Sequence, residues 1–442
     1  MDANPYNPLK PVIDPTMFYG REDALRFLML HLSGRRTRRA LVVLGTRGIG
    51  KSSLLGRVPL VVDERYPSVK VDAAAIELDN IIAFVATIVD QTRAMMTAIE
   101  ASTYRLPPFP DVSDPNTDLL AWLADDYLSV VFSAIRRTRH LILMVDNLHL
   151  VFDAIDAGHF PTGFMGYWQH LLERYEQLDL LFSLDMSYEE RALQTPPMDD
   201  PNLYYRLSHL KPEEALQLIT EPVKTLYGFE PQALEQIQSW AGGHPYHLQA
   251  IGRLLYRRWE EDRAHVNLIT SHDLQAIYPA VLEMAKDTIS PIWEILRPNE
   301  RLVLTAFLDM RAPLTLDDLR NWLESAGYPL EKVQIAAALR GLEYMNVIQV
   351  DQDGRFDFCA QIEADWLYQQ NLGELSPPLR TFSQRWRNAF LGIALVIVIV
   401  VGGTIVFLGE RENNNSIENV ATTTLEPQNP TATVRPMFEF GG

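Results

Sequence analysis

The sequence predicts an α/β fold with a parallel sheet, followed by helical units and one long apolar segment near the C-terminus. Three observations support this prediction. Between Met17 and about Tyr205, apolar strands alternate with helical stretches, which is typical of a parallel sheet with helical crossovers. A glycine-rich loop directly follows the first of these strands. Further along, residues 389–408 contain no charged side chain.

The chain is long enough to contain several folded units. Its 442 residues correspond to about three domains, and a hydrophobic content of 47% is enough to fill their cores. We expect helices at Asn80–Glu100 and Leu119–Arg136, with a proline-rich loop at Tyr104–Asn116. The expected strands are Ala40–Leu44, Ser68–Asp72, His140–Asp146, Leu178–Asp185 and a short Tyr204–Leu207.

The loop after the first strand carries the motif G-x-x-x-x-G-K-[S/T]. Its glycines allow backbone N–H groups to surround phosphate oxygens, and the following helix N-terminus adds its dipole. We expect Lys51 to contact the β- and γ-phosphates and Ser52 to bind Mg²⁺. A glycine-rich turn before a helix is the alternative, which the flanking strand and helix disfavour. The expected nucleotide-binding residues are Gly45, Thr46, Arg47, Gly48, Ile49, Gly50, Lys51, Ser52 and Ser53.

A phosphate-binding loop also needs a carboxylate for Mg²⁺, placed at the end of a neighbouring strand. The apolar strand His140–Asp146 ends in such a residue, so we expect Asp146 to bind Mg²⁺ together with Ser52. Asp146 as a simple turn cap is the alternative. The next residue, Asn147, stands where ATPases of this type usually place an acid that polarises the attacking water.

Asn147 has a consequence for the rate of hydrolysis. An amide cannot accept a proton as a carboxylate does, although it can hold a water molecule by a hydrogen bond. Loss of a general base typically costs about 10²–10⁴ in rate. We therefore expect slow hydrolysis, with Lys51, Asp146 and Asn147 as the catalytic residues.

Composition excludes several other classes of protein. The net charge of −18 and a pI near 5.0 argue against a protein that coats nucleic acid. A single cysteine, Cys359, excludes a disulfide framework and indicates a reducing compartment. The first residues contain no basic region and no apolar run, so we expect no signal peptide.

The uncharged segment 389–408 predicts a single transmembrane helix, because a helix of this length spans about 30 Å. A buried core helix is the alternative. Positive residues favour the cytoplasmic side, and they precede the segment, so we expect the nucleotide-binding portion to be cytoplasmic and the tail to lie outside the cell membrane. The flanking residues are Arg380, Arg385, Trp386 and Arg387 before the segment, and Glu410, Arg411, Glu412, Glu418, Glu426, Arg435 and Glu439 after it.

Two further units are expected between the sheet and this segment. A mostly helical region begins at Lys211 and extends to about Asp262. Three helices and a hairpin with an Asp-Gly turn then predict a winged helix-turn-helix unit. Its helices are expected at Asn299–Leu308, Leu316–Ser325 and Leu330–Tyr344, and its hairpin strands at Val347–Asp351 and Arg355–Phe358.

The charge of this last unit disfavours DNA binding. In the candidate recognition helix, Lys332 and Arg340 are balanced by Glu331 and Glu343. The hairpin turn, D-Q-D-G, is acidic. DNA affinity depends on lysine and arginine residues that neutralise phosphates. We therefore expect a module for packing or assembly and consider DNA an unlikely partner.

Several segments together resemble the signal-transduction ATPases with numerous domains, the STAND branch of the AAA-type P-loop ATPases. The resemblance covers about residues 5–370, and the order and spacing of the segments carry it. The segments are Phe18-Tyr19-Gly20-Arg21-Glu22, Gly45–Ser52, Tyr205-Arg206-Leu207 with Leu210, Glu213-Glu214-Ala215 with Pro222-Val223, and Gly242-Gly243-His244-Pro245-Tyr246 with Leu248-Gln249.

The resemblance implies an adenine site by position. Tyr19 and Gly20 would line the adenine pocket, and Pro245, with His244, would approach the nucleotide from a helical lid. The alternative for this lid segment is a plain glycine-containing turn before a helix.

This sequence also departs from the family pattern. Asn147 replaces the usual acid. The fourth strand ends in Asp185 without the Asn, Thr or Arg that often serves as a phosphate sensor. Arg191 is either a substitute sensor or a solvated surface residue, and we favour the surface residue. The Met-His-Asp motif that some relatives use to hold ADP is absent from the last unit.

We expect a membrane-anchored ATPase that acts as a slow signalling or assembly switch, bound to ATP or ADP with Mg²⁺. Its partners would be a second copy of the chain or another protein. The alternative function is a membrane-tethered winged-helix transcription regulator that binds DNA. The expected divisions are an arm (1–17), the ATPase core (18–208), a helical lid (209–290), the winged-helix unit (291–370), a juxtamembrane linker (371–388), the transmembrane helix (389–408) and a disordered tail (409–442).

Overall fold

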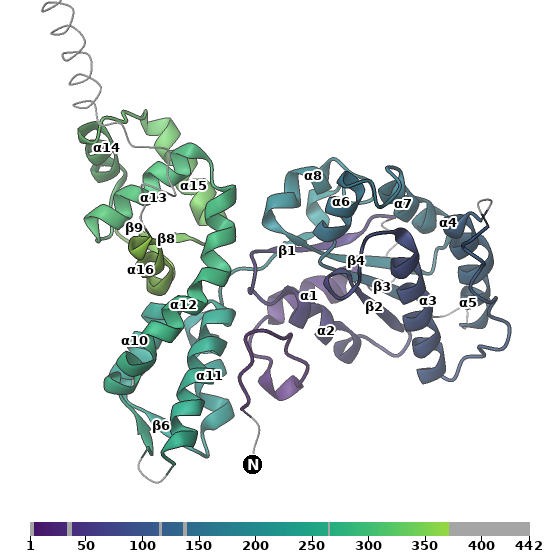
Figure 1. Ribbon diagram of the computed structural model, residues 1–442, viewed down its shortest axis with the longest axis horizontal. Helices are drawn as coiled ribbons and strands as arrows, with labels where there is room; N and C mark the ends of the chain where they lie inside the picture. The colour runs from purple at the N-terminus through teal and green to yellow at the C-terminus, as the bar shows by residue number, and fades with distance from the viewer. Residues whose placement is uncertain (1–3, 33–37, 115–116, 136–138, 264–265, 371–442) are drawn as a thin grey trace, which may run out of the picture. The chain divides into compact units, whose positions relative to one another are not determined.

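The computed structural model describes residues 4–32, 38–114, 117–135, 139–263 and 266–370 (Figure 1). Residues 1–325 and 329–378 form one compact unit. The second unit, residues 326–328 and 379–442, lies almost entirely outside the described part of the chain. The expected linker 371–388, transmembrane helix 389–408 and tail 409–442 all fall outside the described residues.

A five-stranded parallel sheet is the centre of the first half of the chain (Figure 1). Every predicted strand is present, with its ends within one residue of the predicted ends. The predicted α/β fold with a parallel sheet is therefore confirmed. The strands are β1 (Leu41–Gly45), β2 (Ser68–Asp72), β3 (Leu141–Asp146), β4 (Leu178–Asp185) and β5 (Tyr204–Arg206).

The order of the strands is β2-β3-β4-β1-β5, which corrects one expectation. Asp146 was placed on a strand neighbouring that of the phosphate-binding loop, and this is wrong, because β4 pairs with β1 on one side and with β3 on the other. The loop after β1 and Asp146 at the end of β3 still meet at one edge, because all carboxyl ends of a parallel sheet lie at the same edge.

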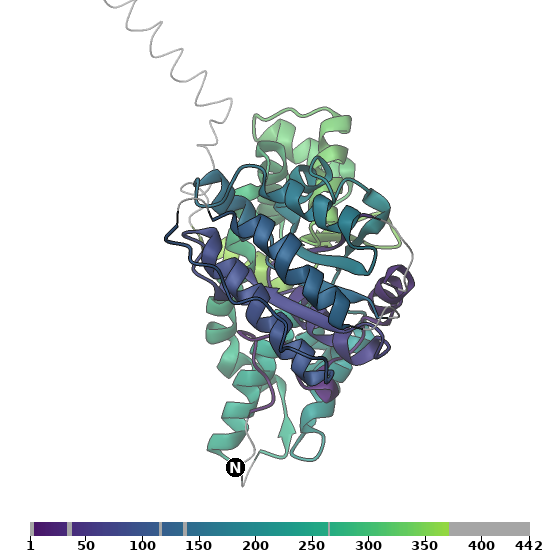
Figure 2. The same ribbon diagram turned by 90° about the vertical axis from the view of Figure 1, so that its right-hand side faces the viewer.

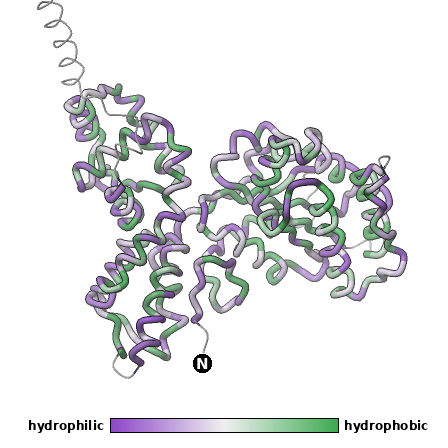
Figure 3. The backbone as a smooth tube through the Cα atoms, viewed as in Figure 1, coloured by the Kyte–Doolittle hydropathy of each residue, from purple (hydrophilic) through white to green (hydrophobic). Residues whose placement is uncertain are grey.

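Helices cover both faces of the sheet (Figure 2). Leu41 and Val43 of β1 pack with α1 (Glu22–His31) and α2 (Lys51–Val61). Val42 and Leu44 belong to the apolar cluster on the other face. Because both faces are covered, the inner strands are apolar along almost their whole length (Figure 3). The other face carries α3 (Ile81–Ala98), α5 (Leu128–Ala134), α6 (His149–Asp156) and α7 (Phe164–Arg174).

Among the described residues, α3 alone is long and apolar enough to cross a membrane by length and composition. One face of α3 is buried in the core of the sheet, including Phe84, Val85 and Ile88. We therefore assign α3 to the core of this fold. The predicted helix at Leu119–Arg136 is divided into α4 (Leu119–Ala121), a π-helical segment (Trp122–Tyr127) and α5.

A short helix, α8 (Glu189–Leu193), precedes β5. Four helices follow β5, namely α9 (Pro212–Thr220), α10 (Pro231–Ala241), α11 (Pro245–Glu261) and α12 (Ser271–Ile295). Two short parallel strands, β6 (Gly228–Phe229) and β7 (Leu268–Ile269), join the loops between them. We refer to α9–α12 as the lid.

The last described segment has the element order that the sequence predicts. Three helices, α13 (Pro298–Met310), α14 (Leu316–Ser325) and α15 (Lys332–Tyr344), precede an antiparallel hairpin of β8 (Ile348–Val350) and β9 (Phe356–Phe358). Leu314 adds an antiparallel bridge to Phe356. The segment ends with α16 (Gln361–Gln369).

Candidate nucleotide-binding site

The loop between β1 and α2 has the backbone geometry of a phosphate cradle. β1 ends at Gly45, and α2 begins at Lys51. Between them, Gly48 and Gly50 have φ values of 77° and 104°, in the left-handed region that glycine adopts without strain. This turn leaves the first N–H groups of α2 free at the N-terminus of a helix, where they bind anions.

Lys51 is buried beneath this loop, and its side chain binds backbone carbonyl oxygens of the loop. Its Nζ donates to the carbonyl oxygens of Gly45 at 2.7 Å and Thr46 at 3.0 Å. Burial lowers the pKa of Lys51, while the charges of Asp185 and Asp146 oppose that shift. A desolvated ammonium group beside free N–H groups is suited to a polyanion such as a triphosphate.

Asp146, at the end of β3, is fully buried and ionised. Burial raises its pKa, but Lys70 and the hydroxyl groups of Ser183 and Ser52 outweigh burial and lower it. The Lys70 Nζ lies 2.9 Å from Asp146 Oδ2. The Ser52 hydroxyl, the other predicted Mg²⁺ ligand, thus lies close enough to Asp146 to lower its pKa. A hydroxyl and a carboxylate oxygen fit the ligand preference of Mg²⁺.

Lys70 is a part of the site that the sequence did not reveal. It lies on β2 and also donates to the Ser52 carbonyl oxygen at 3.2 Å. Lys70 thus connects the strand end of Asp146 with the start of α2. Because Lys70 neutralises Asp146, the protein carries a buried carboxylate here without an unpaired charge.

The side chain of Asn147 is turned toward β2. Its Nδ2 donates to Asp72 Oδ1 at 2.9 Å, and its backbone N–H donates to Ser183 Oγ at 2.9 Å. Asn147 has a φ of 57°, which asparagine tolerates better than most other residues. We expected the Asn147 amide to hold the attacking water, but its Nδ2 already donates to the Asp72 carboxylate.

A small cavity of about 80 Å³ lies beside the loop. It brings together predicted residues from distant parts of the chain, namely Tyr19, the loop and Pro245. Binding pockets usually have volumes of about 300–1,000 Å³, so a nucleotide base enters only if the walls move apart. The walls are Asn7, Pro8, Lys10, Val12, Met17, Phe18, Tyr19, Arg21, Gly48, Ile49, Gly50, Ser53, Leu210, Leu218, Pro245, Tyr246 and Gln249.

The N-terminal arm, the expected division 1–17, forms one wall of this cavity. Tyr6 is buried, and its hydroxyl donates to the Ile219 carbonyl oxygen at 2.6 Å. The Val12 N–H donates to Ser53 Oγ at 2.9 Å. The arm therefore joins α2 to the lid across the cavity.

Gly20 lies outside these walls, although the resemblance implied that it lines the adenine pocket. Gly20 has a φ of 68°, which favours glycine, and a Cβ there would lie 2.5 Å from the movable Glu214 carboxylate. The next residue, Arg21, connects the loop to the lid instead. Its guanidinium donates to the carbonyl oxygens of Ile49 at 2.8 Å and Ser208 at 2.6 Å.

A family model described as an ATPase domain predominantly from Archaea matches residues 18–251, more than half of the chain. The chain belongs to this ATPase family. The matched range contains the phosphate-binding loop, Lys70, Asp146 and, from the lid, α9, α10 and the start of α11. The protein is thus a nucleotide-binding P-loop ATPase.

Solved structures share the fold of the ATPase. The Walker-type ATPase of Pyrococcus abyssi is 16% identical, covers 81% of this chain and 98% of that chain, and gives a TM-score of 0.57. The ORC2 protein of Aeropyrum pernix, in ADPNP–ADP complexes, is 17% identical, with 81% and 95% covered and a TM-score of 0.55. No curated protein sequence matches the chain.

The lid of the ATPase packs directly on the phosphate-binding loop. A Cβ on Gly48 would lie 2.8 Å from the Tyr246 Cβ and 3.1 Å from the His244 ring. His244 caps α11, because its Nδ1 accepts from the Tyr246 N–H at 3.2 Å. The Tyr246 hydroxyl in turn donates to Asp287 of α12 at 2.6 Å. Movement of the loop at Gly48 would therefore displace the start of α11.

A buried histidine–carboxylate pair connects the lid to the last helix of the ATPase. His247 Nε2 lies 2.8 Å from Glu363 Oε1, and the Thr288 hydroxyl donates to the same oxygen at 3.1 Å. With His244, these groups have the residue types of a metal site. However, His244 Nδ1 accepts a hydrogen bond, so its neutral ring carries the proton on Nε2 and has no lone pair for a metal. We interpret the cluster as a buried polar contact that holds α11 and α12 of the lid against α16.

Arg191, the alternative sensor, makes contacts away from the loop of the ATPase. Its guanidinium donates to both carboxylate oxygens of Asp156, at 2.6 and 2.7 Å. It also lies over the Phe152 ring at 4.4 Å. These contacts favour the surface-residue interpretation.

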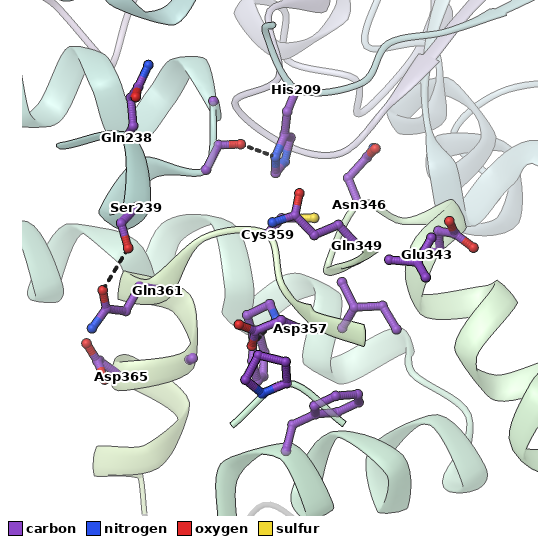
Figure 4. Close-up of a pocket in the computed structure, with 18 of the residues that line it drawn as sticks. His209, Gln238, Ser239, Glu343, Asn346, Gln349, Asp357, Cys359, Gln361 and Asp365 are labelled. Atoms are coloured by element: carbon purple, nitrogen blue, oxygen red, sulfur yellow. Dashed lines mark hydrogen bonds between the residues drawn. The ribbon is translucent and has the colours of Figure 1, made fainter. Parts of the chain in front are cut away.

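A larger cavity of about 850 Å³ lies between α10 and the C-terminal hairpin (Figure 4). Its labelled side chains include the carboxylates Glu343, Asp357 and Asp365, and burial raises the pKa of Asp357. Two hydrogen bonds cross its wall, from Ser239 to Gln361 and between His209 and the Gly242 carbonyl oxygen. These three carboxylates disfavour the binding of a phosphate group in this cavity.

The buried histidines predict a loss of stability in acid. Burial lowers the pKa of His209 to about 4 and that of His244 well below its usual value of 6.5. Between pH 6.5 and about 4 the unfolded chain therefore binds more protons than the folded ATPase, so the free energy of unfolding falls as the pH drops. Urea unfolding at pH 7.5 and pH 5 measures this fall. His209→Asn keeps a donor for Gly242 and should reduce it. An identical fall in the variant would contradict the assignment.

Proposed function

We propose that this P-loop ATPase is a membrane-anchored switch of the STAND type. It binds ATP or ADP with Mg²⁺ at Lys51, Ser52 and Asp146, and it hydrolyses ATP slowly. The nucleotide-binding portion lies on the cytoplasmic side of the cell membrane, anchored by the segment 389–408. The nucleotide state changes the packing of the lid and the C-terminal unit, and thereby assembly with further copies of the chain or with another protein.

The contact of the lid with the loop at Gly48 carries this proposal. His244 and Tyr246 touch the loop, His247 of the same helix binds Glu363 of α16, and Tyr246 binds Asp287 of α12. A phosphate group that rearranges the loop would therefore act on helices that precede the proposed anchor. Two-state repacking at such contacts is a common form of switching.

We propose a winged-helix module for packing or assembly at residues 291–370. The order of three helices and a hairpin supports it, as does the Leu314 bridge to the hairpin. On its candidate recognition helix, Lys332 lies 2.8 Å from Asp317, so this cation already has a partner. DNA is therefore a less suitable ligand for this face than a protein surface.

We expect slow hydrolysis because position 147 offers no proton acceptor beside the Mg²⁺ carboxylate, so any acceptor must act from another strand. An enzyme that acts through its nucleotide state needs that state to last longer than the repacking it controls. We expect turnover well below about one per second, the lower end of common enzyme rates.

The experiment uses the full chain in detergent. Nucleotide that co-purifies is identified, and the mass of the particle is then measured with Mg²⁺ and either ADP or ATP. The expected results are bound adenine nucleotide and a different oligomeric state or protease-sensitivity pattern for the two. An unchanged mass and pattern would contradict the switch, and turnover faster than about ten per second would contradict slow hydrolysis.

A further inference from the structure

The site leaves one chemical task without a residue, if ATP is hydrolysed as proposed above. The attacking water must lose a proton, and Asn147 cannot accept it. Its amide is also engaged by Asp72 at 2.9 Å. A different side chain at the same edge of the sheet must therefore do this work.

Three adjacent strands, β2, β3 and β4, each end in an aspartate: Asp72, Asp146 and Asp185. Asp146 is bound to Lys70, Ser183 and Ser52. Asp72 accepts from the Asn147 amide and from the Ala74 N–H at 3.0 Å. Asp185 remains as the carboxylate that is not used to hold another part of the nucleotide site.

Asp185 lies between the phosphate-binding loop and the Mg²⁺ carboxylate. Its strand, β4, lies between β1 and β3 in the sheet. Asp185 pairs in register with Gly45, whose carbonyl oxygen holds Lys51. Alternate residues of a strand share a face, so Asp185 lies on the same face as Ser183, which donates to Asp146.

The carboxylate of Asp185 is oriented from one side only. Its Oδ1 accepts from the Ser187 N–H at 3.1 Å and from the Ser187 hydroxyl at 2.8 Å. Within the described part of the chain, no hydrogen bond to its Oδ2 is found. One oxygen therefore fixes the side chain, while the other is available to a water molecule.

We propose that Asp185 is the catalytic carboxylate that replaces the acid expected at position 147. The water oxygen forms a bond to the γ-phosphorus while the bond from that phosphorus to the β–γ bridging oxygen breaks. The bridging oxygen leaves on ADP with the electron pair of the broken bond. The proton of the water passes to Asp185 and then to the released phosphate.

His149 is the other proton acceptor near this position. It stands at the start of α6 and faces Asp185, Lys51, Asp153 and Asp146, with the Tyr188 ring 5.6 Å from its own. His149 lies on α6, whereas Asp185 is held beside Gly45 by the pairing of β4 with β1. The experiment therefore includes both residues.

The test compares ATP hydrolysis with ATP binding for the full chain in detergent at saturating MgATP. Asp185→Asn keeps the acceptor for Ser187 and should lose about 10²-fold or more in turnover, with ATP affinity changed by less than about threefold. Asp111→Asn is the matched control, because in an exposed loop Asp111 Oδ1 accepts from the Ser113 N–H at 3.0 Å and from the Ser113 hydroxyl at 2.6 Å, as Asp185 does from Ser187. His149→Gln tests the rival. Both should retain turnover within about threefold.

Different failures have different meanings in this experiment. Wild-type turnover in Asp185→Asn, or a large loss in Asp111→Asn or His149→Gln instead, would overturn the role of Asp185. Binding of ATP without any hydrolysis by the wild-type chain would also overturn it, while nucleotide binding stays intact. If the wild-type chain binds no nucleotide, the proposed function itself fails.

Discussion

Replacing Lys51 with methionine abolishes nucleotide binding without weakening the fold. The Lys51 ammonium is buried, and within the described residues it donates to the carbonyl oxygens of Gly45 and Thr46. Each charge-assisted hydrogen bond to a phosphate contributes about 1.5–3 kcal/mol, so the loss of two such bonds weakens binding by about 10²–10⁴-fold. Methionine has a similar length and removes the cost of burying a charge.

Thermal unfolding of the full chain with and without MgATP measures this difference. A ligand at about 100 times its Kd stabilises the wild-type protein by about 2.7 kcal/mol, whereas Lys51→Met should show no shift at the same concentration. Without nucleotide, Lys51→Met should unfold at the wild-type temperature or higher. Lys224→Met, at an exposed lysine paired with Glu221 at 2.7 Å, is the matched control. A full nucleotide shift in Lys51→Met would refute the assignment of the loop.

The sequence predicted those parts of the fold that depend on local pattern. The inner strands are buried on both faces, so they appear as uninterrupted apolar runs that are easy to delimit. The phosphate-binding loop was equally clear, because its glycines and Lys51 serve one chemical purpose at fixed spacing. The hairpin after α15 was predicted from an Asp-Gly turn between two short strands, and Gly354 has the expected positive φ of 75°.

Features that depend on contacts between distant segments were not predictable in this way. No local pattern says that β4 lies between β1 and β3, since strand order is decided by packing of the whole sheet. Lys70 alternates with buried valines, so from the sequence it resembles a solvent-facing residue of an edge strand. Only the folded sheet shows that it pairs with Asp146. The sequence showed only that Asp185 stands where relatives often carry a phosphate sensor. Its position beside Gly45 depends on the pairing of β4 with β1, which no local pattern predicts.

Helix α12 shows how tertiary packing overrides a local signal. It runs for 25 residues through Pro279 and Pro291, and proline normally ends or kinks a helix. Its buried residues recur at helical spacing, including Leu274, Ile277 and Val281, so the apolar stripe outweighs the two lost hydrogen bonds. The expected helical lid extends to residue 290, but the two prolines give no local sign of one continuous helix.

Replacing Gly242 with alanine causes the largest loss of stability that we expect from a single added methyl group. Gly242 ends α10 with a φ of 54°, and a Cβ there would lie 1.9 Å from the Cys359 carbonyl oxygen. A left-handed conformation costs a non-glycine residue about 1–2 kcal/mol. Overlap in a packed region adds about 1–3 kcal/mol, because a backbone carbonyl cannot rotate away as a side chain does.

Gly158→Ala separates these two costs. Gly158 has a φ of 77°, and a Cβ there would meet no atom within 4 Å. Urea unfolding should therefore show a loss of about 1–2 kcal/mol for Gly158→Ala and about 2–5 kcal/mol for Gly242→Ala.

Relief of the overlap at Gly242 also requires Cys359 to move, and Glu363 follows Cys359 by four residues on α16. Gly242→Ala should thus weaken the contact of Glu363 with His247 and expose α16 to protease. Equal losses in the two variants would show that the backbone at Cys359 yields freely and that this joint between α10 and the hairpin is not tightly packed.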